Sequence, residues 1–150
     1  MFYNSIDGII LVHDLTNRKS EDNLHYWLSE ILEENESISI LGSSPSSNDS
    51  FHSPVKDQSP IPLIVIGTKL DKAQLVRNSE SLRTASSYIA TQHRADEINL
   101  DCMDPKYLAP ATTNSVKLAK FFNKAIAYKI AHQNRVDSSA SKNNFQSKLK

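Results

Sequence analysis

The sequence predicts an α/β fold, a three-stranded parallel sheet with crossover helices. Two apolar runs, residues 9–12 and 63–66, and the shorter stretch 97–102 predict the strands. Segments with helical spacing of apolar residues separate these strands and follow the last one. Strands that alternate with helices favour parallel pairing and right-handed crossovers. A chain of 150 residues has room for one such domain.

The first two elements are a strand through residues 9–12 and a helix over about 20–35. The strand is apolar at consecutive positions, which is typical of a sheet covered on both faces. Ser20 is a candidate N-cap of the helix, because its hydroxyl can accept a bond from a free backbone amide. The predicted buried face of this helix consists of Leu24, Trp27, Leu28, Ile31 and Leu32.

The remaining elements follow the second strand. A weaker helix is expected over roughly 79–93, with Leu82, Ala85 and Ile89 on its apolar side. The third strand follows at 97–102, and the best-formed helix covers about 114–132. The apolar face of that last helix consists of Leu118, Phe121, Phe122, Ala125 and Ile126.

Two segments fall outside this pattern. Of the 25 residues from 36 to 60, nine are serine and three are proline, so the segment has little apolar surface to bury. We expect a disordered insertion at 36–61 within a domain that covers residues 1–132. Residues 133–150 are polar and mildly basic, and we expect a flexible polar tail there.

Composition narrows the function classes. Seventeen basic residues balance seventeen acidic ones, so no overall charge favours nucleic acid or an anionic membrane. A single cysteine, Cys102, excludes an internal disulfide and suits a reducing compartment. We expect it to be a buried thiol. No signal peptide precedes the first strand and no apolar run approaches ~20 residues, so a cytoplasmic protein is expected. The histidines lack the spacing of metal ligands.

Polar side chains follow the second strand at once. After Gly67, the residues Thr68, Lys69, Leu70 and Asp71 form the pattern TKLD at its carboxyl end, where open parallel sheets bind ligands. One carboxylate, that of Asp71, can accept bonds from both the N1–H and the exocyclic amine of guanine, which adenine cannot offer. The stem of Lys69 can lie over the base while Thr68 braces the loop. The alternative is an ordinary polar turn before the next helix.

Together with its neighbours, the motif resembles the Ras superfamily of small GTPases, in particular its Rab-like members. The similar stretches are FYNSIDGIILVHDLTNRKSEDNL, IPLIVIGTKLD, EINLDC, PKYLA and NSVKLAKFFNKAI, within about residues 2–35 and 61–130. The resemblance implies the C-terminal half of a small-GTPase domain that binds GTP or GDP. It also implies base contacts from the backbone after the third strand, at Asp101, Cys102 and Met103. The usual Ser-Ala of that loop is absent, and Thr68 replaces a common asparagine.

The phosphate-binding part of the family pattern is missing from these residues. The sequence has three glycines, none within GxxxxGK[ST], and it contains no DxxG segment. Family members hold the β- and γ-phosphates and Mg²⁺ with those motifs. We therefore expect weak nucleotide binding, no magnesium site and no GTP hydrolysis. The alternative function is a non-catalytic pseudo-GTPase module for interactions in signalling or trafficking.

The resemblance also implies partners and an incomplete core. It suggests homodimerisation and contacts with signalling or trafficking proteins, whereas the tail lacks the cysteines that carry a lipid anchor in Rab proteins. In the family sheet, another strand lies beside the one at residues 9–12. We therefore expect an exposed apolar edge there and a half-covered last helix, which together favour an oligomeric, chaperone-bound or partly unfolded chain.

Overall fold

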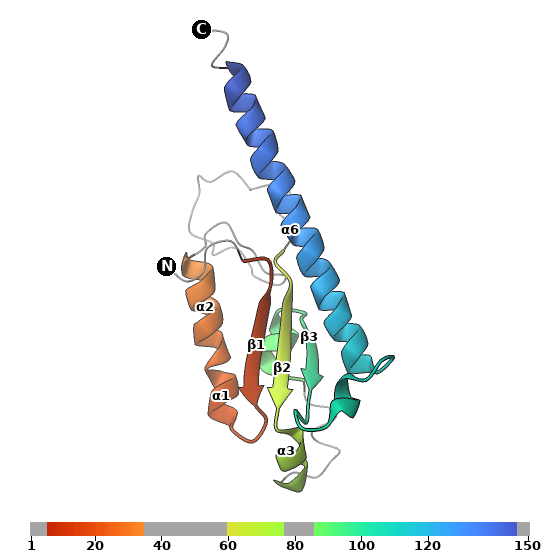
Figure 1. Cartoon of the computed structure of the whole chain (residues 1–150). Coiled ribbons are helices and arrows are strands. Elements are labelled where there is room, and N and C mark those ends of the chain that lie inside the picture. The colour runs from red at the N-terminus through yellow and green to blue at the C-terminus, as the bar shows by residue number, and fades with distance from the viewer. Residues whose placement is uncertain (1–5, 35–59, 77–85, 147–150) are drawn as a thin grey trace.

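Three parallel strands form one sheet, in the order β1-β2-β3, in a computed structural model that describes residues 6–34, 60–76 and 86–146. The strands are β1 (Ile9–Asp14), β2 (Leu63–Thr68) and β3 (Asp96–Asn99). Helices lie on both sides of the sheet (Figure 1). The predicted α/β fold with a three-stranded parallel sheet is confirmed.

The strand register brings the three carboxyl ends to one edge of the sheet. In β1 and β2 the pairs run from Ile9 with Leu63 to Asp14 with Thr68. The pairing of β2 with β3 ends at Gly67 and Asn99. The third strand therefore begins and ends earlier than the predicted 97–102. One more bond, from Leu100 N to Gly67 O at 2.8 Å, holds the chain beside β2 before it turns away.

The first crossover contains two helices where one was predicted. Helix α1 spans Arg18–Asp22 and α2 spans Leu24–Glu34. The N-cap is Asn17, whose side chain accepts a bond from Lys19 N, so the prediction of Ser20 as the cap is wrong. Leu24 and Leu28 are buried as predicted. Trp27 is 56% exposed, because only the Leu24–Leu28 side of the apolar stripe faces the sheet.

The second crossover is described in two parts. Helix α3 (Leu70–Val76) starts directly after the TKLD loop, and α5 (Tyr88–Gln92) precedes β3. Ser87 caps α5 by accepting a bond from Ala90 N at 3.3 Å. Ile89 is fully buried as predicted. The other predicted apolar positions of this helix, Leu82 and Ala85, lie outside the described residues.

A short 3-10 helix, η1 (Pro105–Leu108), leads to the long helix α6 (Thr113–Gln146). The segment from residue 133, predicted as a flexible polar tail, is helical as far as residue 146, and it contains no glycine or proline to end a helix. Within the described residues, no helix is both long enough and apolar enough to span a membrane. The predicted insertion lies outside these residues except for its end, where Ile61 is buried in the core.

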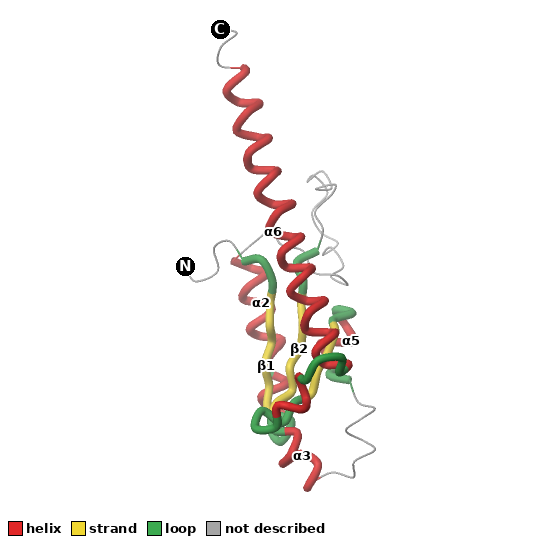
Figure 2. Tube along the Cα trace, turned by 45° about the vertical axis from the view of Figure 1, so that its right-hand side comes forward, coloured by secondary structure: helices red, strands yellow, loops and turns green. Residues whose placement is uncertain are grey.

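Two apolar clusters form the core, one on each face of the sheet. Figure 2 shows α2 and α6 on either side of β1 and β2. On the first face, Leu28 of α2 and Ile89 of α5 pack in one cluster with alternate residues of β1 and β2, namely Ile9, Leu11 and Val65. On the second face, α6 packs over β2 and β3. The members of that cluster are Ile64, Ile98, Leu100 and Phe121.

The second face is incompletely covered. Ile10 and Val12 of β1 are 43% and 54% exposed, so β1 is covered on one face and the prediction of two covered faces is wrong for this strand. Phe122 and Ile126 of α6 are 49% and 57% exposed. The expected apolar edge and half-covered helix are therefore confirmed.

Candidate functional site

The TKLD loop lies at the edge of the sheet where the three strands end. Thr68 is the last residue of β2, and its Oγ1 donates a hydrogen bond to the carbonyl oxygen of His13 at 2.8 Å. A second bond joins the strand ends, because Leu15 N donates to Thr68 O at 3.0 Å. Thr68 thus joins the start of the loop to the end of β1.

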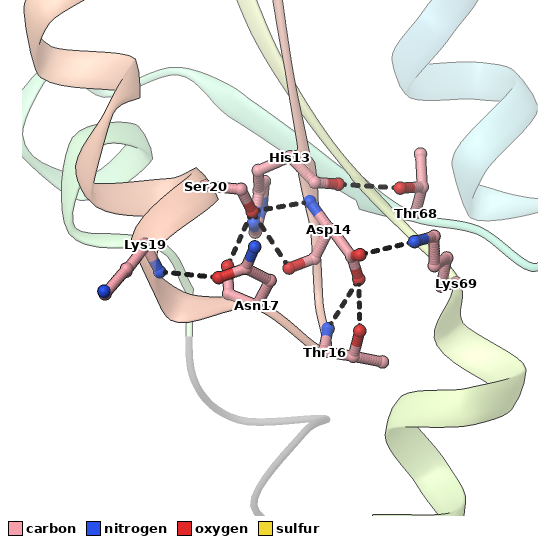
Figure 3. Close-up of polar contacts among 8 residues, drawn as sticks. All are labelled: His13, Asp14, Thr16, Asn17, Lys19, Ser20, Thr68 and Lys69. Atoms are coloured by element: carbon pink, nitrogen blue, oxygen red, sulfur yellow. Dashed lines mark hydrogen bonds and ion pairs between the residues drawn. The ribbon is translucent and has the colours of Figure 1, made fainter.

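Lys69 forms an ion pair with Asp14, the last residue of β1. Its backbone is left-handed, with φ of 60°, a conformation that costs a non-glycine residue about 1–2 kcal/mol. Its Nζ lies 2.6 Å from Asp14 Oδ2. Figure 3 shows the lysine side chain directed across the strand ends to this carboxylate. The ion pair therefore orients the stem that was predicted to lie over a base.

Asp14, the ion-pair partner of Lys69, also accepts hydrogen bonds from Thr16. Its Oδ1 accepts bonds from Thr16 N at 2.8 Å and Thr16 Oγ1 at 2.6 Å. The bond from Lys69, followed by the bonds from Thr16, lowers the pKa of the Asp14 carboxyl from 3.8 to about 2. Asp14 is therefore a carboxylate at neutral pH.

The loop behind Asp14 is held by side-chain bonds to the backbone (Figure 3). Ser20 Oγ accepts a bond from Asp14 N at 2.9 Å and lies 2.6 Å from the carbonyl oxygen of Asn17, to which it donates. Asn17 Oδ1 accepts from Lys19 N at 3.1 Å. Ser20, predicted as a helix cap, thus fixes the chain around the carboxylate that holds Lys69.

Asp71 lies in the first turn of α3 and its side chain is exposed. Helix α3 follows the left-handed Lys69, and Ala73 N donates to Lys69 O at 3.0 Å. Among the described residues, the Asp71 carboxylate has no hydrogen bond or ion pair. Two carboxylate oxygens are therefore available for a ligand that carries adjacent donors.

The loop after β3 lies against the TKLD loop. Leu70 N donates to Leu100 O at 3.1 Å, which ties the two loops together. The Asp101 carboxylate accepts a bond from Met103 N at 2.9 Å, so this side chain shapes its own turn. Cys102 is exposed and Met103 is 89% exposed, so the prediction of a buried thiol is wrong. The thiol is exposed because β3 ends before it and the turn projects outward.

The sequence reasoning missed Asp14 as a member of this site. Asp14 ends a strand just as the TKLD motif follows one. The signal was available, because parallel neighbours deliver their carboxyl ends to the same edge. The structure brings together Thr68, Lys69 and Asp14 at the strand ends, and a backbone hydrogen bond joins the loops that contain Asp71 and Asp101. No cluster of three metal-ligating side chains occurs among the described residues.

Comparison with known proteins identifies relatives of the chain. It is 46% identical over 126 residues to Rab-like protein 3 of Bos taurus, covering 84% of this chain and 52% of the relative. It is 42% identical over 130 residues to Rab-like protein 3 of Danio rerio, with the same shares. Small GTPase-like protein LIP2 of Arabidopsis thaliana is 36% identical over 77 residues, 49% of this chain and 19% of the relative.

The Rab-like protein 3 matches cover most of the chain but only part of each relative. The chain spans about half the length of the Rab-like protein 3 relatives. No family model matches it.

Proposed function

We propose that this chain, which belongs to the Ras superfamily of small GTPases, reads the guanine base of a guanine nucleotide through its TKLD loop. The observation that carries the proposal is the arrangement of Lys69 and Asp71. The lysine is clamped by Asp14 at 2.6 Å, and the carboxylate beyond it is exposed and has no partner among the described residues.

The chemistry of guanine fits this arrangement. Its N1–H and exocyclic amine point in the same direction, so one carboxylate can accept both bonds, and charge-assisted bonds of this kind are strong. The Lys69 stem offers an apolar surface to the ring. Backbone groups near Asp101 and Cys102 would complete the contact from the neighbouring loop. Adenine presents one acceptor and one donor to the same carboxylate and is rejected.

The phosphates receive little help from these residues. The sequence holds no GxxxxGK[ST] loop, whose amides and lysine would bind the β- and γ-phosphates. We therefore propose that this chain alone binds GTP and GDP weakly, engages no Mg²⁺ and hydrolyses nothing. The exposed thiol of Cys102 suits the reducing environment of the cytoplasm.

Nucleotide titrations monitored by NMR of the labelled chain test this proposal. GMP and GDP should shift the amide signals of residues 67–71 and 100–103 with similar affinities, and AMP should not. Asp71→Asn should abolish the shifts, because an amide cannot accept both guanine bonds. Asp22→Asn, an exposed change on α1, is the control. A GDP affinity far above that of GMP would show a phosphate site and contradict the proposal.

A second function, an interaction module, is favoured by the exposed apolar surface. Ile10 and Val12 of β1 lie exposed beside a long helix with its own exposed apolar stripe, consisting of Phe122, Ile126 and Ile130. A scattered exposed residue is ordinary, whereas grouped apolar side chains mark interaction sites. We propose that a second copy of the chain, or a signalling or trafficking protein, covers this surface.

Light scattering tests the second function. The chain should form a dimer whose dissociation follows dilution, and Ile126→Lys should shift it to monomer. Tyr26→Lys, an exposed change on α2, is the matched control and should leave the mass unchanged. A monomer at all concentrations would contradict self-association.

A further inference from the structure

A cavity of about 470 Å³ lies at the opposite end of the sheet from the TKLD loop. It is bounded by the residues before β2, by the turn from α5 to β3, and by α6 where the helix passes the start of the strands. We call it the strand-start cavity. Its lining includes Ile61, Leu63, Ala95, Ala127, Tyr128 and Ala131.

The size and lining of the strand-start cavity suit a small apolar body. Ligand pockets commonly measure about 300–1,000 Å³ and are mostly apolar. Alanines at 127 and 131 leave room between α6 and the sheet where larger side chains would fill the space. Ile61 is buried at its base. An apolar chain or ring bound there would leave water and contact these apolar side chains, which is favourable.

The charged groups at the strand-start cavity favour an anion. Arg94, Lys124 and Asp96 all line it. The Asp96 carboxylate lies 3.2 Å from the ammonium of Lys120, so its charge is already compensated. Within residues 6–34, 60–76 and 86–146, Arg94 and Lys124 form no ion pair. Two cations therefore remain for a ligand.

The backbone at Arg94 fixes the position of this residue at the end of α5. Arg94 follows the end of α5 with φ of 49°, a left-handed conformation. Ala95 N donates to Ala90 O at 2.9 Å and Arg94 N donates to Thr91 O at 3.3 Å, which is the pattern of a Schellman helix end. Glycine is favoured at the left-handed position of such a helix end. Arginine at position 94 is therefore disfavoured by the backbone conformation.

We propose that the strand-start cavity binds a small amphipathic anion, with an apolar chain or ring inside and one carboxylate between Arg94 and Lys124. The site is separate from the TKLD loop and does not depend on guanine binding. The apolar walls supply the attraction for the body of the ligand, and the two cations select the sign of its head group.

Calorimetric titration of the full chain with decanoate, below its micelle concentration, tests the proposal. Decanoate should bind at one site per chain, and decyltrimethylammonium, with the same tail and the opposite charge, should bind at least about tenfold more weakly. Equal binding of the two would show that only exposed apolar surface takes up the tail, and would overturn the proposal.

Arg94→Gly separates the binding role from the structural one. Glycine relieves the left-handed turn, so the thermal midpoint should rise by about 2–4 °C, while decanoate affinity should fall by about tenfold or more. Lys124→Gln, an exposed change, should weaken decanoate similarly. If both variants bind decanoate as tightly as the unaltered chain, the proposal is wrong.

A change of volume provides the last test. Ala127→Phe should fill the strand-start cavity and abolish decanoate binding. Ala119→Phe, on the same helix but outside the cavity lining, is the control and should bind normally. Loss of binding in Ala119→Phe together with normal binding in Ala127→Phe would place the ligand elsewhere and overturn the assignment.

Discussion

The two faces of the sheet are built from equally apolar strands but are covered unequally. On the first face α2 and α5 bury Ile9, Leu11 and Val65, whereas on the second face α6 lies over β2 and β3 and leaves Ile10 and Val12 exposed. Adjacent isoleucines thus have opposite environments. The difference teaches that burial is decided here by which helix is available to each face, and that hydrophobicity alone does not distinguish the positions.

The two phenylalanines of α6 give the largest expected contrast. Phe121 is 5% exposed and meets the sheet, and Phe122 is 49% exposed. Phe121→Ala should lower the free energy of unfolding by about 3–5 kcal/mol, since it leaves a cavity in the second cluster. Phe122→Ala should cost about 1 kcal/mol or less. Urea denaturation checks both values, and equal costs would show that a partner covers Phe122 in solution.

The neighbouring isoleucines of β1 make the same comparison within one strand. Ile9→Ala should cost about 2–5 kcal/mol, because Ile9 lies in the first cluster. Ile10→Ala should cost about 1.5 kcal/mol or less, because 43% of the residue is already exposed. Denaturation at two protein concentrations sharpens this test. A cost for Ile10→Ala that grows with concentration would mean that another molecule buries it.

Gly67 tests how tightly the first face is closed. A Cβ at this position would clash with Asn99 Oδ1 and would lie 2.7 Å from Leu15 Cδ2. Gly67→Ala should therefore cost about 1–3 kcal/mol, as overpacking does. Gly8→Ala is the comparison on the second face, where the nearest atom is Phe121 Cζ at 3.0 Å. We expect thermal melting to show the smaller loss for Gly8→Ala.

The smallest effect concerns the polar end of β1, where Asp14 follows Ile10 and Val12 on the face that α6 leaves open. The pKa of Asp14 is lowered to about 2, so its contribution to stability is present above pH 3.8 and is lost as the pH falls through about 2. Lys69→Gln should raise this pKa toward 3.8. Carbon-13 NMR titration of the carboxyl measures it, and an unchanged pKa would show that Thr16 alone sets the value.

Much of the fold could be predicted because its strands are unbroken apolar runs. Residues 9–12 and 63–66 have no competing helical pattern, and their alternation with amphipathic segments leaves few topologies. Helix boundaries were less predictable. Asn17 and Ser20 are both favoured caps and stand three residues apart, so local chemistry could not decide between them. Trp27 belongs to the apolar stripe of α2. The stripe is wider than the helix surface that contacts the sheet, so Trp27 at its side stays exposed.

The site was predictable where one segment carries it. Thr68, Lys69 and Asp71 follow a buried strand directly, so their placement at the carboxyl edge required only the identification of that strand. The ion pair of Lys69 with Asp14 joins residues 55 positions apart. It depends on the register of β1 with β2. The hydrophobic pattern of two strands does not define their register until it is known which strands pair. The exposure of Cys102 depended likewise on where β3 stops.

The length of α6 has a mechanical consequence. Its 34 residues span about 50 Å at the usual rise per residue, and the contacts with the sheet lie in its first half. Figure 1 shows the helix continuing past the sheet, away from the TKLD edge. The portion around Phe121 packs against the sheet, and the remainder of the helix extends from it as a long arm. A small change in the angle between the helix and the sheet near Phe121 would therefore give a large displacement at Gln146.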